Sequence, residues 1–175
     1  MQKNNNTRLR SMVLTGLFSA FVATATMIAV PMATGYVNAG DIIILLGAFT
    51  LSPIQAILSA AIGSSIADLI NGYAVYIPAT FIIKGCMALC AHYILRALTK
   101  ISVTDKISTV IASLASELVM AIGYTAYEWT VLGYGAAALG GMVGNLIQAS
   151  FGIVGGVSLY FILKHTNLKS KLFAI

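Results

Sequence analysis

Residues 63–85 read GSSIADLINGYAVYIPATFIIKG and decide the predicted fold, because two apolar segments are joined here by the turn-forming stretch NGYAVYIP. The stretch carries one acid, Asp68, and one base, Lys84, in otherwise apolar surroundings. If the segments are helices running in opposite directions, the two charges come to a similar depth. In lipid, each would need a partner or a functional role. The sequence therefore predicts a helical hairpin in which Asp68 pairs with Lys84, caps the turn or reaches water.

The composition of the whole chain indicates a membrane protein. Hydrophobic residues make up 59% of the 175 residues, charged residues only 9%, and the mean hydropathy is +0.93. Soluble domains carry about 25% charged residues, so this chain cannot cover a water-exposed surface. The net charge of +5 does not indicate nucleic-acid binding, because the basic residues lie at the ends of apolar runs and do not cluster with aromatic residues.

The apolar runs predict an all-α, single integral membrane domain over residues 1–175, with six transmembrane helices. A span needs about 20 apolar residues, and the predicted helices cover residues 9–30, 39–52, 54–71, 78–99, 107–128 and 136–164. The second is short, so it must tilt little, be shielded by its neighbours or begin inside the membrane. The first exceeds the apolar core of a signal peptide and is expected to remain as a membrane helix.

Basic residues predict the orientation of these helices. With both termini in the cytoplasm, every lysine and arginine except Lys84 falls on the inner side, as the positive-inside rule requires. The outer loops are then left with an aromatic belt, which consists of Tyr36, Tyr73, Tyr76, Trp129 and Tyr134.

Polar side chains within the spans predict a cavity that opens to the outside. On the predicted helices they occupy the centre and outer half of the bilayer, and they are Lys84, Glu117, Tyr124, Glu128, Asn145 and Gln148. A charge at the centre of a helix costs about 2.5–3.5 kcal/mol on insertion scales, so these groups should face protein or trapped water. Each alone can form a structural ion pair or interhelical hydrogen bond, but their convergence from three helices favours a small-molecule site.

Two polar residues near the start of the second predicted helix have separate interpretations. Asn38 lies in the preceding loop, from which it can contribute a ligand over the cavity mouth. Asp41 begins the helix, where a negative charge suits the positive end of the helix dipole.

Small residues indicate close helix packing at both ends of the chain. Gly16, Ala20 and Thr24 recur every fourth residue in the first helix, as do Ser19 and Ala23. Such faces let two membrane helices approach closely, most often within one chain. The glycines of the sixth helix are likewise expected to serve internal packing, and they are Gly140, Gly141, Gly144, Gly152, Gly155 and Gly156.

The sequence contains no motif of a known enzyme class. A phosphate-binding loop, an HExxH zinc motif and a nucleophile elbow are all absent. Cys86 and Cys90 lie four apart in one apolar run and are expected to be reduced packing residues, and no metal site is expected. Uphill transport would therefore draw energy from ions or from another subunit. A stand-alone ion-coupled carrier with Glu117 as its relay remains an alternative, although no internal repeat of spans is found.

Three segments carry a resemblance to a known family. They are NAGDIIILLGAFTLSPIQAILSAAIGSSIADLINGYAVYIPATFIIKG (residues 38–85), ELVMAIGYTAYE (117–128) and GNLIQASFG (144–152). In order and spacing the chain resembles the substrate-binding S component of energy-coupling factor (ECF) vitamin transporters. The closest branch is the one for pyridoxine or hydroxymethylpyrimidine, with S components for thiamine or riboflavin as alternatives.

The resemblance implies a function. Such S components capture a vitamin from outside, dock on a membrane coupling subunit that carries two cytoplasmic ATPases, and are thought to topple in the bilayer to release it inside. It implies that ATP and Mg²⁺ bind the partner ATPases, that this chain needs no cofactor, and that the docking face falls on Gly16, Ala20 and Ala23. The implied substrate-binding residues are Asn38, Lys84, Glu117, Tyr124, Glu128, Asn145 and Gln148. A Lys84 free to donate to a phenolate-like oxygen would slightly favour pyridoxine.

Overall fold

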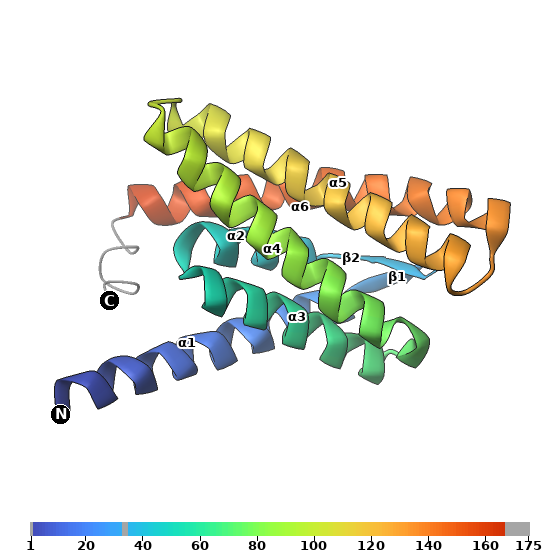
Figure 1. Ribbon diagram of the computed structural model, residues 1–175, viewed down its shortest axis with the longest axis horizontal. Coiled ribbons are helices and arrows are strands. Elements are labelled where there is room, and N and C mark those ends of the chain that lie inside the picture. The colour runs from blue at the N-terminus through green and yellow to red at the C-terminus, as the bar shows by residue number, and fades with distance from the viewer. Residues whose placement is uncertain (1, 33–34, 167–175) are drawn as a thin grey trace.

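The computed structural model describes residues 2–32 and 35–166, which form a bundle of helices with one short β-hairpin (Figure 1). In chain order the elements are α1 (Gln2–Met27), β1 (Ala29–Pro31), β2 (Tyr36–Asn38), α2 (Gly40–Thr50), α3 (Pro53–Ile70), the 3₁₀ turn η1 (Ala74–Tyr76), α4 (Ile77–Lys100), α5 (Asp105–Thr130), η2 (Gly135–Ala137) and α6 (Ala138–His165). The prediction of an all-α membrane protein is confirmed apart from the hairpin.

Five stretches are long and apolar enough to cross a membrane, namely Arg8–Met27, Pro53–Ile70, Ala74–Lys100, Asp105–Thr130 and Gly135–His165. Large apolar side chains remain exposed along them, for example Ile122 on α5 and Val154 on α6. An apolar outer surface of this kind is what contact with lipid requires.

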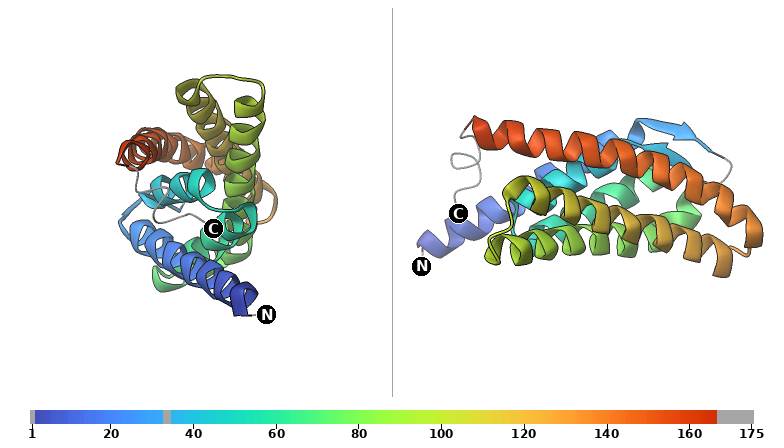
Figure 2. Two further views of the ribbon diagram at one scale, coloured as in Figure 1. Left: turned by 90° about the vertical axis from the view of Figure 1, so that its left-hand side faces the viewer. Right: turned by 90° about the horizontal axis from the view of Figure 1, so that it is seen from above.

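Helix α2 (Gly40–Thr50) is shorter than the helix predicted over residues 39–52, and it is shielded by its neighbours, one of the alternatives left open for it. Its 11 residues extend about 16 Å at about 1.5 Å each, half of a hydrocarbon core of roughly 30 Å. Nine of the 11 are buried, and the longer helices surround α2 in the end view of Figure 2. A helix shielded on all sides needs no polar face. The helix occupies the half of the bundle that holds the start of α1 and the end of α6, and the hairpin occupies the other half (Figure 1). Its N-terminus therefore lies near mid-depth.

The hairpin also corrects the end of the first helix. Helix α1 ends at Met27, and Ala29–Pro31 pairs antiparallel with Tyr36–Asn38. Pro31 thus lies at the end of a strand and not at the end of a helix. This position tolerates proline, because the ribbon has only two strands and each leaves one edge unpaired.

Glycines allow the close approaches between helices. A Cβ at Gly63 of α3 would lie 2.5 Å from the Ser19 carbonyl oxygen and 2.8 Å from Val22 Cβ on α1. Gly155 and Gly156 of α6 lie in the same way against side chains of α2. The prediction that the α6 glycines serve internal packing is confirmed for these two positions, whereas Gly140 faces open space.

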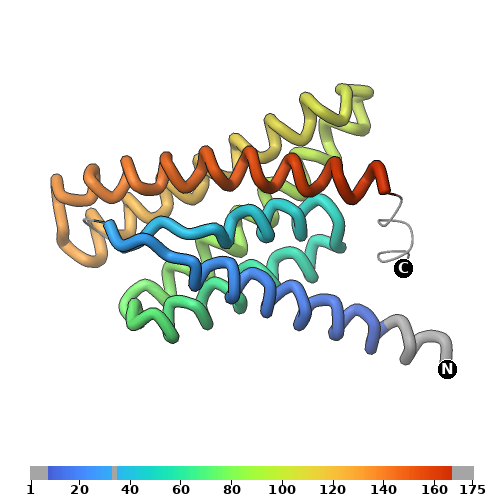
Figure 3. Tube along the Cα trace, turned by 180° about the vertical axis from the view of Figure 1, so that it is seen from behind, coloured from blue at the N-terminus to red at the C-terminus, as the bar shows by residue number. Residues whose placement is uncertain are grey.

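The described chain begins and ends at the same end of the bundle, as the rear view in Figure 3 shows. The α4–α5 turn lies at this end as well (Figure 1). An exposed ion pair between Lys164 and Asp105 joins α6 to α5 there. The ends of α3 and α5 lie at the opposite side (Figure 1).

Candidate functional site

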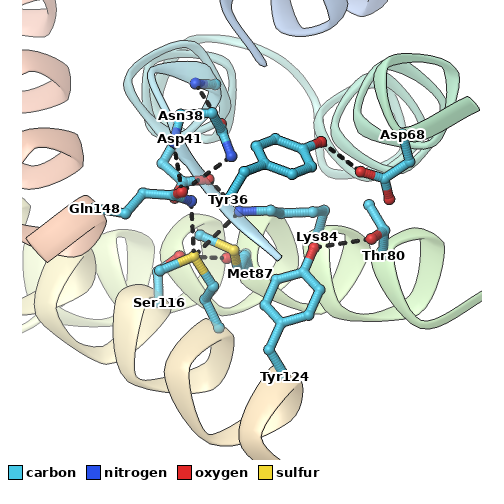
Figure 4. Close-up of polar contacts among 12 residues, drawn as sticks. Tyr36, Asn38, Asp41, Asp68, Thr80, Lys84, Met87, Ser116, Tyr124 and Gln148 are labelled. Carbon is cyan, nitrogen blue, oxygen red and sulfur yellow. Dashed lines mark hydrogen bonds and ion pairs between the residues drawn. The ribbon is translucent and has the colours of Figure 1, made fainter. Parts of the chain in front are cut away.

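The centre of the bundle holds a buried ion pair between Lys84 of α4 and Asp41 of α2 (Figure 4). The two side chains are 2% and 0% exposed, respectively. Lys84 Nζ also lies 3.2 Å from Met120 Sδ, and Gln148 Nε2 donates a hydrogen bond of 2.5 Å to the second carboxylate oxygen of Asp41. In a low-dielectric interior, breaking such a pair would leave an uncompensated charge.

Asn38 attaches the hairpin to this pair. Its backbone N–H and its Nδ2 donate to Gln148 Oε1 at 2.8 and 2.9 Å, and its Oδ1 accepts from the Gly40 N–H at 2.8 Å. Gln148 therefore donates to α2 and accepts from β2 at the same time. This one side chain fixes the position of the hairpin relative to α2 and α6.

A second layer of polar contacts lies on the outer side of the ion pair. Tyr36 Oη donates to Asp68 Oδ1 at 2.5 Å, and Tyr76 Oη donates to a Glu128 carboxylate oxygen at 3.0 Å. Burial raises the pKa of the Tyr36 phenol above its ordinary value, and the adjacent Asp68 carboxylate raises it further. Tyr36 therefore stays protonated and remains a donor.

These two layers enclose a cavity with about 430 Å³ of empty space, its opening included. Its wall is formed by Thr26, Gly35, Tyr36, Asn38, Ser64, Asp68, Tyr76, Thr80, Lys84, Tyr124, Glu128, Asn145 and Gln148. The mixture of aromatic rings with a few polar groups is typical of small-molecule sites. All but one of the predicted substrate-binding residues line this cavity.

Glu117 is the predicted residue that does not line it. Its side chain is 2% exposed, and neither carboxyl oxygen has a hydrogen-bond partner among the residues the structure describes. A Cβ at Gly152 would lie 2.6 Å from Glu117 Oε1 and 3.0 Å from Asp41 Cβ. Glu117 thus lies beside the ion pair, next to the cavity and not in its wall.

The ion pair adds a partner to one expected residue and excludes one of the alternatives left open for another. Asp41 does lie in the first turn of α2, as predicted, but its carboxylate bonds to Lys84 and Gln148. Asp68 does not form an ion pair with Lys84 and instead accepts from Tyr36. Asp41 was missed because a helix start usually lies at the membrane surface. The short length of α2 was the available signal that its start lies deeper.

Tyr36 and Tyr76 were also missed as cavity residues, because they had been placed in an aromatic belt at the outer interface. Tyr36 belongs to the hairpin, and the sequence did not predict a strand there. Tyr76 ends the 3₁₀ turn before α4 and is 7% exposed. Both rings turn inward.

A separate open groove runs between α1 and α3. Gly16, Ala20 and Ala23 line it together with apolar side chains of α3 such as Leu58 and Ile62. Gly16 has no atom within 4 Å of the position that a Cβ would take, and Ala20 is exposed, whereas Ala23 is buried. The predicted docking residues therefore share one surface.

Comparison with known proteins agrees with the resemblance. The family model for the "ECF-type riboflavin transporter, S component" matches residues 6–165. A relative from Pyrococcus woesei, described as an uncharacterized protein in a gap 3' region, is 29% identical over 137 residues, which cover 78% of this chain and 88% of its own. The family carries the name of riboflavin and gives no support to the pyridoxine or hydroxymethylpyrimidine branch. The match extends over most of the sequence, and the chain therefore belongs to the family of ECF-type riboflavin transporter S components, which are multi-pass proteins of the plasma membrane.

Proposed function

We propose that this chain captures a planar vitamin of the riboflavin class from outside the cell. The observation that carries the proposal is the cavity whose wall combines tyrosine rings with amide and charged side chains. Its residues come from the later parts of α1, α3 and α5, from the earlier parts of α4 and α6, from the hairpin and from Tyr76. These parts lie on the side of the bundle opposite the end of α6 (Figure 1). A site there receives its ligand from the face opposite the basic chain ends.

The cavity wall suits a flat heterocycle. The rings of Tyr76 and Tyr124 lie 6.4 Å apart between centroids and are tilted by 57°. Asn145 is half-buried in the wall, and its side-chain amide makes no hydrogen bond within the described part of the chain, so this amide can both donate to and accept from a ring edge. Aromatic faces with one free amide fit a ring that carries carbonyl and N–H groups.

The structure removes the basis for the slight preference for pyridoxine as the substrate. It depended on a Lys84 free to donate to a phenolate-like oxygen, and Lys84 is bound by Asp41. The family name adds support for the flavin class. Pyridoxine, hydroxymethylpyrimidine and thiamine are the competitors in the test below.

Release of the vitamin inside would depend on partners. We propose that the α1–α3 groove, with Gly16 and Ala20 exposed along it, receives a membrane helix of a coupling subunit. Two cytoplasmic ATPases attached to that subunit would bind ATP and Mg²⁺, and this chain would contribute no cofactor. Both of its termini would lie in the cytoplasm, where the basic residues Arg96, Lys100 and Lys106 at the α4–α5 turn favour that orientation.

Titration of the purified full-length protein with riboflavin tests the substrate. We expect saturable quenching of flavin fluorescence, no displacement by excess pyridoxine, hydroxymethylpyrimidine or thiamine, and a loss of affinity of about tenfold or more in Asn145→Ala. Ser150→Ala is the matched control, because Ser150 lies further along α6, is exposed and bonds only to the Leu146 carbonyl. Displacement by pyridoxine would overturn the flavin class.

Uptake into cells separates the proposal from a stand-alone carrier. We expect no riboflavin uptake when this chain is expressed without an ATPase module. Uptake that persists without the module and follows an ion gradient would instead support the ion-coupled carrier.

A further inference from the structure

One wall of the cavity carries polar atoms that the protein itself does not satisfy. Thr26 of α1 and Ser64 and Asp68 of α3 are 2%, 1% and 3% exposed. Thr26 Oγ1, Ser64 Oγ and Asp68 Oδ2 have no hydrogen-bond partner among the described residues, and all three side chains line the cavity. Buried polar atoms are normally paired, so each such atom calls for a physical explanation.

The two hydroxyl groups differ from most hydroxyls on these helices. Ser65 Oγ is also buried without a partner among the described residues, but Ser65 does not line the cavity. Serine and threonine in a membrane helix usually bond to the carbonyl four residues earlier. Ten hydroxyls follow this rule here, at Thr15, Ser19, Thr24, Thr50, Thr99, Thr109, Ser113, Thr125, Thr130 and Ser150. Thr26 and Ser64 do not, although Val22 and Ala60 offer the equivalent carbonyls. Both hydroxyls are therefore left free at the cavity wall.

Asp68 adds an acceptor to the same wall. Ser64 and Asp68 are four residues apart on α3, so their side chains lie on one face, with Cβ atoms about 5–6 Å apart. Tyr36 satisfies one carboxylate oxygen of Asp68 and leaves the other open (Figure 4). The ion pairs of the described residues do not include Asp68. The wall thus presents one acceptor and two groups that both donate and accept.

We propose that this wall, formed by Thr26, Ser64 and Asp68, binds an aliphatic arm of the vitamin that carries several hydroxyl groups. The inference rests on the proposed function and adds to it the part of the ligand that meets α1 and α3, while the ring lies against Tyr76, Tyr124 and Asn145. A hydroxyl on the arm donates to Asp68, and neighbouring hydroxyls exchange hydrogen bonds with Ser64 and Thr26. An ammonium group could donate to Asp68 and to both hydroxyl oxygens, but it would leave the Ser64 and Thr26 hydroxyl protons without an acceptor.

Two flavins with the same ring system test this assignment. Riboflavin carries a hydroxylated chain on the ring nitrogen, and lumiflavin carries a methyl group there. The purified full-length protein is titrated with each flavin, and quenching of flavin fluorescence gives both dissociation constants for wild type, Ser64→Ala, Asp68→Asn and the control Ser150→Ala. Thermal unfolding of each variant reports whether the fold is intact.

We expect riboflavin to bind more weakly by roughly threefold to tenfold in Ser64→Ala and by about tenfold or more in Asp68→Asn, because the second change removes a charged acceptor. Lumiflavin affinity should change by less than about twofold in both, and Ser150→Ala should change neither constant. If Asp68→Asn does not fold, the riboflavin and lumiflavin dissociation constants of Ser64→Ala test the assignment.

Equal losses for the two flavins, or no loss for either, would overturn the assignment of the arm while leaving the proposed function in place. A wild-type protein that binds neither flavin would overturn the proposed function and this assignment together.

Discussion

Lys84 of α4 and Asp41 of α2 form an ion pair across 43 positions of sequence, and both side chains are almost completely buried. The pair joins the fourth helix to the start of the half-length helix, and Lys84 also lines the cavity. The contact that holds α2 against α4 therefore also fixes the position of a side chain in the cavity wall.

Replacing one member of this pair should destabilise the protein more than replacing both members together. We expect Asp41→Asn and Lys84→Met each to cost about 3–5 kcal/mol, because each leaves an unpaired polar group or charge in the interior. The double variant should recover part of that loss. Thermal unfolding in detergent for the four proteins of the cycle measures the coupling, and strictly additive losses would contradict a direct interaction.

Gln148 should control the position of the hairpin. Gln148→Leu removes the acceptor for Asn38 and the donor to Asp41, at a cost of about 1–3 kcal/mol for the groups left unpaired. We expect faster amide hydrogen exchange at Tyr36–Asn38 in this variant. Ile147→Ala is the control, because Ile147 is 44% exposed on the outer face of α6. Unchanged exchange at β2 in Gln148→Leu would show that other contacts hold the hairpin.

Gly63 should be essential for packing of α1 on α3. Gly63→Ala places a methyl group 2.5 Å from the Ser19 carbonyl, a backbone atom that cannot rotate away, so we expect a loss of about 1–3 kcal/mol. Gly140→Ala, which has open space at the Cβ position, should be neutral or slightly stabilising. Similar unfolding temperatures for the two variants would contradict the close contact.

Tyr36 should make stability depend on pH in the alkaline range. Its raised pKa means that the folded state keeps the phenol proton while the unfolded state loses it above the ordinary value of 10.0. This contribution is fully present below that pH and is lost progressively as the pH rises above it. The wild type should therefore lose more stability than Tyr36→Phe between about pH 9 and about pH 11, after subtraction of their difference at neutral pH. Parallel curves would contradict the buried environment of Tyr36.

Much of the fold could be predicted from the sequence because lipid imposes simple rules. Apolar length identified the five long helices, and the turn NGYAVYIP placed the reversal between α3 and α4. The hairpin and the half-length α2 could not be predicted in the same way. Only three residues pair in each strand, and the burial of α2 depends on neighbours that are distant in sequence.

The candidate site was predictable in part for the same reason. Polar residues within spans are few, so Lys84, Asn145 and Gln148 stood out, and all three line the cavity. The pairing of Lys84 was not predictable, because Asp41 and Asp68 were both plausible partners and helix rotation decides between them.

Native mass spectrometry of the full-length protein after addition of riboflavin tests the central claim most directly. We predict one bound vitamin per chain in wild type and in Ser150→Ala, and loss of the bound mass in Asn145→Ala with its fold intact. No bound mass in wild type at saturating vitamin, or equal retention by Asn145→Ala, would contradict the assignment of this cavity as the binding site.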